Sequence, residues 1–305
     1  LSNMKLINTI LMAACSAFLL ASCCSAEQKD CCPAEKEMAI QLYSARDLIG
    51  NAEKYAANHE QVLKALAEMG YTSVEAANFA DGKFYGVSPE QFKADVEAAG
   101  MKVLSSHTNY RLSKEELASG DLTAALAWWD AALPAHKAAG MEYVVIPSIG
   151  KPATLKELQV ICDYFNAVGK KCNELGMKFG YHNHAYEMET VEDKIMIEYL
   201  LENTDPALVF YQIDVYWAVY GHYSPADLFN KYPGRFTLLH IKDKKEIGQS
   251  GMVGFDAVFG NAEVAGMEGY VVEVEGCRNE AALEGIRVSA DYLRKAPFVK
   301  TSYGK

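Results

Sequence analysis

The chain has 305 residues, half of them apolar, and a formal net charge of −11 at neutral pH. This length suits one large domain with a sizeable core. Strong acidity without a basic stripe opposes binding to a phosphate backbone, so we expect no nucleic-acid partner. The sequence also lacks a glycine-rich loop followed by Lys-Ser/Thr and a Gly-x-Ser-x-Gly elbow, which argues against nucleotide binding and serine hydrolysis.

The first 22 residues have the pattern of a secretory signal. Lys5 precedes an uncharged stretch, residues 6–22, and residues 20–23 read Leu-Ala-Ser-Cys. This ending resembles a bacterial lipoprotein box, which implies cleavage before Cys23 and lipidation of that cysteine. The residues after Cys23, up to residue 36, are small, polar and charged, and we interpret them as a flexible tether. We therefore expect a lipid anchor in the cell envelope, on the periplasmic or surface side; an uncleaved anchor helix is the alternative.

Strand-like and helix-like segments alternate from residue 38 onward. The expected strands are short apolar runs, and several expected helices end at a glycine. The expected strands cover residues 38–43, 73–77, 102–106, 143–147, 178–182, 208–214, 237–241 and 270–273. The expected helices cover residues 51–69, 89–99, 122–139, 153–175, 192–202, 225–231, 255–265 and 279–294. Eight such units predict a (β/α)8 TIM barrel, a single domain over residues 37–305, with its active site at the C-terminal strand ends.

Ligand-type side chains stand at the ends of the last four expected strands. They are His182, Asp214, His240 and Glu273. Because the C-terminal ends of parallel strands meet at one face of a barrel, all four could point at one metal ion. Simpler alternatives exist for two of them: Asp214 as the N-cap of a helix, and His240 as a hydrogen-bonded core histidine.

Residues spaced by two along a strand point to the same face, which adds candidates beside these four. His182 and His184 share a face, so one would bind metal and the other substrate, in either assignment. Lys242 follows His240 by two and could neutralise an enolate oxygen or an anionic group of the substrate; the alternative is a surface lysine. Glu275 follows Glu273 by two, as a second carboxylate of the pocket or as a solvated loop charge.

Several of these stretches resemble the sugar phosphate isomerase/epimerase family, one of the xylose isomerase-like barrels. They are residues 41–47, 181–184 and 240–243, with Asp214 and Glu273. The resemblance covers roughly residues 37–297 and implies one divalent metal, manganese, magnesium, cobalt or zinc, at the ends of strands five to eight. The family's usual ligands are Glu, Asp, His and Glu. The last three match Asp214, His240 and Glu273, whereas the first falls on His182.

The resemblance also implies chemistry and substrate contacts. It implies a sugar isomerase or epimerase that removes a proton beside a carbonyl and passes through an enediolate, with Glu273 and His182 as catalytic residues. Lys242 is the third catalytic candidate, from its position two residues after His240. Strand-end positions such as Glu75 and His107 would contact the substrate, as would His184; structural hydrogen bonding is the alternative for the first two. Trp217 lies in an aromatic cluster after Asp214 and would stack on a sugar face, with core packing as the alternative.

The histidine at position 182 keeps other reactions open. A metal-bound imidazole is a poor base, so a lyase or dehydratase acting on a keto-sugar or inosose is the nearest alternative. A non-catalytic sugar-binding lipoprotein is a further one. A nuclease like the related endonuclease IV would need more metal ligands, and the net charge opposes it. We expect a carbohydrate as the small-molecule partner and membrane contact only through the lipid anchor; a homodimer stays open.

Overall fold

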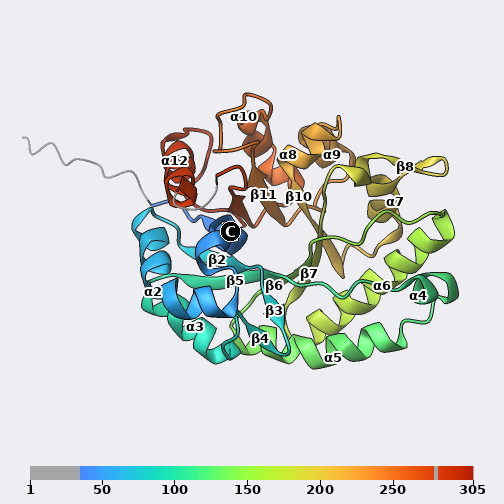
Figure 1. Ribbon diagram of the computed structural model, residues 1–305. Helices are drawn as coiled ribbons and strands as arrows, with labels where there is room; N and C mark the ends of the chain where they lie inside the picture. Colours follow the sequence, from blue (N-terminus) through green and yellow to red (C-terminus); the bar gives the residue numbers. More distant parts are fainter. Residues whose placement is uncertain (1–34, 278–280, 305) are drawn as a thin grey trace, which may run out of the picture. The chain divides into compact units, whose positions relative to one another are not determined.

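The computed structural model describes residues 35–277 and 281–304. The expected signal peptide, Cys23 and most of the expected tether lie outside these residues. The described unit is built on eight parallel strands that close into a barrel in the order β1-β12-β11-β10-β7-β6-β5-β2 (Figure 1). These strands are β1 (Ala39–Gln41), β2 (Ser73–Ala76), β5 (Lys102–His107), β6 (Tyr143–Ile146), β7 (Lys178–His182), β10 (Val209–Asp214), β11 (Leu238–Lys242) and β12 (Gly269–Glu273). The predicted fold class, a single-domain (β/α)8 TIM barrel, is confirmed.

Helices follow the strands and pack their apolar faces on the barrel. The longer ones are α2 (Ala52–Glu68), α3 (Pro89–Ala98), α5 (Thr123–Ala138), α6 (Leu155–Glu174), α7 (Met196–Asn203) and α12 (Ala281–Lys295). Shorter ones are α1 (Arg46–Ile49), α4 (Lys114–Ser119), α8 (Val215–Tyr220), α9 (Pro225–Lys231), α10 (Phe255–Gly260) and α11 (Ala262–Ala265), with 3-10 turns η1 (Leu42–Ala45) and η2 (Tyr186–Met188). Within the described residues, we find no helix with the length and apolar character needed to cross a membrane.

Glycine ends two of the predicted helices where the chain must turn back into the barrel. Gly140 follows α5 and Gly176 follows α6, with φ of 82° and 69°. This left-handed conformation is costly for residues with a Cβ, so glycine allows each helix to stop and the next strand to begin within a few residues.

Strand register brings the polar strand ends to one level. Asp214 on β10 pairs with His240 on β11, and Lys242 pairs with Glu273 on β12. On the other side of β10, Gln212 pairs with His182 of β7. Parallel pairing therefore places side chains that are far apart in sequence around one barrel mouth.

Two of the predicted helices differ from the structure. The helix expected over residues 192–202 begins only at Met196, because β8 (Thr190–Val191) and β9 (Lys194–Ile195) form an antiparallel hairpin before it. Glu192 lies in the turn with φ of 54°, a conformation that no α-helix can contain. The helix expected over residues 255–265 is divided into α10 and α11 at Asn261.

Candidate active site

Two carboxylates and an imidazole converge at the ends of the last three barrel strands. His240 Nδ1 lies 3.5 Å from Asp214 Oδ2 and 3.6 Å from Glu273 Oε2. One ligand atom from each residue lies within 4.8 Å of the others, and the three side chains are buried. We call these three residues the carboxylate group. Asp214 Oδ2 and His240 Nδ1 have no hydrogen-bond partner in the described structure, so the group fits a divalent cation that would complete their coordination.

Asp214 combines two roles that the sequence left as alternatives. Its Oδ1 accepts a hydrogen bond from the backbone N–H of Trp217 at 2.8 Å and so caps the N-terminus of α8. Its Oδ2 remains directed at His240. The backbone N–H of Asp214 donates to Asn183 Oδ1 at 2.8 Å, which ties β10 to the end of β7. The cap and this tie fix the carboxylate in place.

Electrostatics at His240 also favour a cation in the carboxylate group. Burial alone would lower the pKa of His240, but the carboxylates of Asp214, Glu75 and Glu273 outweigh burial and raise the pKa to about 10. Without a metal, the imidazolium itself supplies positive charge between buried carboxylates. Because a metal ligand must be a neutral imidazole, metal binding would release this proton and replace its charge.

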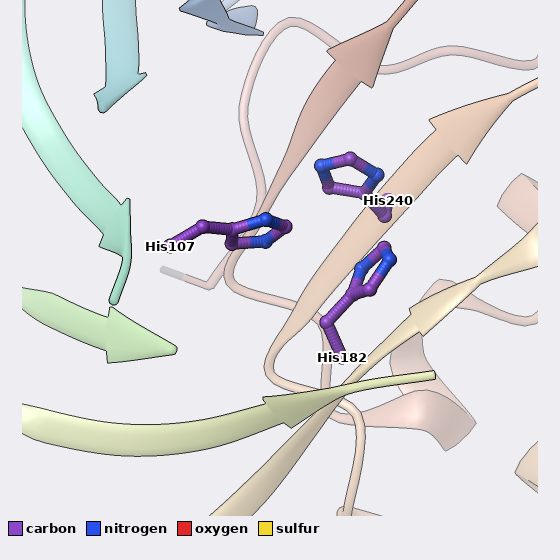
Figure 2. Close-up of side chains that lie close together, drawn as sticks. All are labelled: His107, His182 and His240. Carbon is purple, nitrogen blue, oxygen red and sulfur yellow. The ribbon is translucent and has the colours of Figure 1, made fainter. Parts of the chain in front are cut away.

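Three imidazoles form a second cluster beside the first. His107 from β5, His182 from β7 and His240 from β11 converge (Figure 2), and one ligand atom from each lies within 4.8 Å of the others. We call them the histidine group. Ring centroids are 4.8 Å apart for His107 and His182, and 4.6 Å apart for His182 and His240. The expected ligand set is thus divided: His240 belongs to both groups, whereas His182 lies with His107.

Glu75 lies beneath both groups as a fully buried carboxylate with donors from several strands. These donors are Gln41 Nε2 (2.8 Å), Ser105 Oγ (2.6 Å), Gln212 Nε2 (2.8 Å), His107 Nε2 (3.1 Å) and His240 Nε2 (3.2 Å). Burial alone would raise the pKa of Glu75, but the histidines and the serine outweigh it and lower the pKa to about 2. The sequence predicted substrate contact for Glu75; in the structure both of its oxygens are engaged by protein donors.

Lys242 is almost fully buried and lies between two glutamates rather than at the surface. Its Nζ is 2.5 Å from Glu275 Oε2 and 3.6 Å from Glu273 Oε2. The ammonium also lies 5.8 Å from the centre of the Trp217 ring. Burial alone would lower the pKa of Lys242, but the surrounding carboxylates raise it. Lys242 is therefore a fixed positive charge beside Glu273, and Glu275 is an ion-pair partner rather than a free loop charge.

A cavity of about 580 Å³ opens at these strand ends. The predicted site residues that line it are His107, His182, His184, Trp217, Glu273 and Glu275. Burial lowers the pKa of His182 and of His184, so their rings are neutral. Burial raises the pKa of Glu273, against the influence of Lys242 and His240. A larger cavity of about 770 Å³ lies at the opposite strand ends, away from both groups, and barrel enzymes carry their chemistry at the C-terminal ends.

The sequence did not identify Glu187, a buried residue that holds the loop carrying His184. Glu187 Oε2 accepts a hydrogen bond from the backbone N–H of His184 at 2.9 Å, and Oε1 accepts one from the hydroxyl of Tyr181. Burial raises the pKa of Glu187 to about 7. A carboxylate three residues after a turn residue is the one signal in the sequence that points to such a backbone contact.

Comparison with known proteins relates the chain to the xylose isomerase-like barrels. A sequence profile described as xylose isomerase-like TIM barrel matches residues 63–296. The crystal structure of a sugar phosphate isomerase/epimerase from Parabacteroides distasonis superposes with a TM-score of 0.78 at 33% identity, covering 88% of this chain and 97% of that one. The IolI protein, solved with a zinc atom, covers 88% of this chain and 100% of its own at a TM-score of 0.65 and 13% identity, which shows the fold alone.

Two curated relatives are inosose dehydratases. Inosose dehydratase of Geobacillus kaustophilus is 28% identical over 214 residues, which is 65% of this chain and 65% of that enzyme. The match to inosose dehydratase of Clostridium beijerinckii is 32% identical over 88 residues and covers 29% of either chain. The chain therefore spans less than two thirds of the length of these enzymes.

Proposed function

The chain belongs to the xylose isomerase-like TIM barrel family, and from that premise we propose that it is a metal-dependent sugar isomerase or epimerase. The observation that carries the proposal is the placement of Glu273. This buried carboxylate belongs to the carboxylate group, lines the cavity, and lies beside the buried ammonium of Lys242. A base, a fixed cation and a metal-binding group at one point suit proton abstraction beside a carbonyl.

Asp214, His240 and Glu273 would hold the metal. Two carboxylates and one imidazole suit manganese, magnesium, cobalt or zinc, and the remaining positions would be open to substrate or water. When bound, such an ion polarises neighbouring oxygens of the substrate and so favours loss of the adjacent C–H proton. The nitrogen of His240 that faces Glu75 would keep its proton, because the carboxylate of Glu75 accepts it at 3.2 Å. This is a common arrangement for metal-binding histidines.

Glu273 and His182 would divide the proton transfers. In an isomerisation, Glu273 takes the proton from the carbon beside the carbonyl and returns it to the neighbouring carbon; its raised pKa makes it a stronger base than an exposed carboxylate. His182, neutral and with an unpartnered Nδ1, takes the hydroxyl proton and returns it to the former carbonyl oxygen. Lys242 stabilises the negative charge of the enediolate between these steps.

The cavity supports a carbohydrate as substrate. Its volume of about 580 Å³ exceeds what one sugar ring fills. The ring of Trp217 lies 5.8 Å from that of His184, and both line the cavity, so an aromatic face is available for the C–H face of a sugar. With Cys23 as the proposed lipid anchor in the envelope, a free sugar or glycoside fits better than a phosphorylated metabolite.

Incubation of the manganese-loaded protein with a panel of ketoses and keto-glycosides in D2O tests the proposal by NMR. Deuterium at the carbon beside the carbonyl, with no loss of a substituent, is the expected result. Absence of exchange with every sugar and every metal in a protein that binds metal would contradict an isomerase and would favour a sugar-binding role.

A dehydratase or lyase is the second candidate, favoured by the similarity to inosose dehydratase over 214 residues. The first step would be the same proton abstraction by Glu273. Glu273 would then pass the proton it has taken to a departing hydroxyl group, which leaves as water while the C=C bond forms. Appearance of an unsaturated product in the same NMR experiment would select this reaction over isomerisation.

A further inference from the structure

We propose that His107, His182 and His240, the histidine group, form a second site for a divalent metal of the zinc type. Figure 2 shows the three rings, and the site shares His240 with the carboxylate group. The proposal rests on the positions of three rings from three different strands, and on the carboxylate of Glu75, which contacts two of the rings.

The closed barrel brings nitrogens of three histidines from three strands close together. One nitrogen from each of the three rings lies within 4.8 Å of the other two, and zinc binds imidazole nitrogens at about 2.0–2.1 Å. His182 is 2% exposed, and its Nδ1 has no hydrogen-bond partner in the described structure. A buried, unpartnered nitrogen that faces two further imidazoles is unfavourable unless a cation or a water completes it.

Glu75 prepares two of the rings for metal. Its Oε1 lies 3.1 Å from Nε2 of His107 and 3.2 Å from Nε2 of His240. A carboxylate at Nε2 keeps the proton there and leaves the lone pair on Nδ1, since a neutral imidazole has one donor and one acceptor nitrogen. Carboxylates in this position orient metal-binding histidines and raise their basicity. The negative charge of Glu75 also offsets part of the charge of a cation held by three neutral ligands.

Because both sites need His240, a chain can fill only one of them at a time. His240 has one lone pair, and its Nδ1 lies 3.5 Å from Asp214 Oδ2, so it completes one group at a time. Imidazole ligands favour zinc, nickel and copper, whereas carboxylates favour manganese and magnesium. We therefore expect one ion per chain, with zinc in the histidine group and manganese in the carboxylate group.

This inference deepens the proposed function, because zinc in the histidine group would occupy His182 and His240. Its test measures binding and not turnover. Dissociation constants for Zn²⁺ and Mn²⁺ would be measured by competition with a chromophoric chelator and by electron paramagnetic resonance, respectively. The variants are His182→Asn, His107→Gln and Asp214→Asn, with His184→Asn as the matched control, since His184 lines the same cavity but lies outside both groups.

The expected result is that the two sets of variants affect different metals. His182→Asn and His107→Gln weaken Zn²⁺ binding by at least about tenfold and leave Mn²⁺ binding within about threefold, whereas Asp214→Asn does the reverse. His184→Asn changes neither. Circular dichroism checks folding; if His182→Asn does not fold, His107→Gln decides, because glutamine still donates an N–H to Glu75.

Two outcomes would overturn the second site and separate it from the proposed function. If Asp214→Asn removes both metals while the histidine variants keep Zn²⁺, the second site is wrong and the carboxylate group stands. If no variant changes Zn²⁺ binding, the ion binds elsewhere and the second site is again wrong. Conversely, loss of Zn²⁺ in the histidine variants with unchanged Mn²⁺ binding in Asp214→Asn would support the second site and contradict the metal site of the proposed function.

Discussion

The two sides of the barrel mouth differ in the charge of their side chains. Strands β10 to β12 supply Asp214, Glu273 and Lys242, which carry charge, whereas β5, β7 and the loop after β7 supply His107, His182 and His184, which are neutral imidazoles. Under the proposed function, the charged side would stabilise a metal and an enediolate, and the neutral side would exchange protons without a large change in field. The two sides together would supply both requirements of enediolate chemistry at one barrel mouth.

Each side depends on a buried glutamate, and the pKa values of the two glutamates are shifted in opposite directions. Glu75 supports His107 and His240 through direct contacts and has a pKa of about 2. Glu187 supports the backbone at His184 and has a pKa of about 7. Positively charged and amide partners surround the first, whereas burial dominates around the second. Replacement of Glu75 should therefore lower the free energy of unfolding, whereas replacement of Glu187 should raise it above neutral pH.

The largest effect is expected on the charged side, from Glu273→Gln. Glutamine keeps the shape of the side chain but cannot accept the carbon-bound proton, so deuterium exchange into a responsive sugar should fall by about 100-fold or more. Glu275→Gln is the matched control, because this neighbour pairs with Lys242 without joining the carboxylate group. An equal loss in both variants would show that the charge around Lys242, and not a base at position 273, carries the reaction.

Glu75→Gln should destabilise the fold strongly. Removing one partner of a buried, hydrogen-bonded charge cluster typically costs about 3–5 kcal/mol. Because the folded pKa of Glu75 is about 2, below its usual 4.5, its stabilisation is complete above pH 4.5 and is lost as the pH falls towards 2. Urea unfolding at pH 7 and pH 3 should show a difference from wild type that shrinks at the lower pH. Exposed Glu60→Gln is the control, and a pH-independent difference would contradict this account.

Glu187→Gln should change the free energy of unfolding in the opposite direction to Glu75→Gln. The folded pKa of about 7 lies above the usual 4.5, so the folded state holds a proton that the unfolded state releases, and stability falls as the pH rises from 4.5 through 7. At about 1.4 kcal/mol per pKa unit, the penalty above pH 7 is about 3 kcal/mol. The free energy of unfolding of the variant should therefore lack this decrease between pH 5 and pH 8. Exposed Glu189→Gln should keep it, and an unchanged slope in Glu187→Gln would refute the assignment.

On the neutral side, substitutions of His182 and His184 should affect different kinetic constants. His182→Asn should lower kcat by about 10- to 100-fold, because the hydroxyl proton then lacks its acceptor. His184→Asn should act mainly on KM, by less than about tenfold, since we propose that this ring contacts the substrate without taking a proton. Steady-state kinetics of both variants test the division of roles. The reverse pattern would assign the proton transfer to His184, the other arrangement that the sequence allowed.

Much of the fold follows from local signals in the sequence. Short apolar strands, amphipathic helices and glycines such as Gly140 and Gly176 specify each β/α unit within a few residues of its own chain. Parallel pairing then dictates that strand-end residues meet, so Asp214, His240 and Glu273 could be placed together from their positions alone. Their meeting depends on the register of neighbouring strands and on nothing more distant.

The rest depends on contacts across the barrel that no local pattern contains. The role of Glu75 is set by donors from β1, β5, β10 and β11, which only the closed barrel brings together. The separation of His182 from the carboxylate group depends on the direction of its ring, which strand alternation fixes only to one face of the sheet. The hairpin over residues 190–195 was missed because its turn rests on a non-glycine residue, Glu192, with positive φ.

The most direct test of the central claim is the metal content of residues 33–305, expressed as wild type and as Asp214→Ala. Both proteins would be reloaded with manganese, dialysed mildly and measured by mass spectrometry for bound metal. The account predicts about one manganese ion per wild-type chain and none in the variant, because Asp214 belongs to the carboxylate group and its buried Oδ2 has no hydrogen-bond partner in the described structure. Equal metal content in the two proteins, or no metal in either, would contradict it.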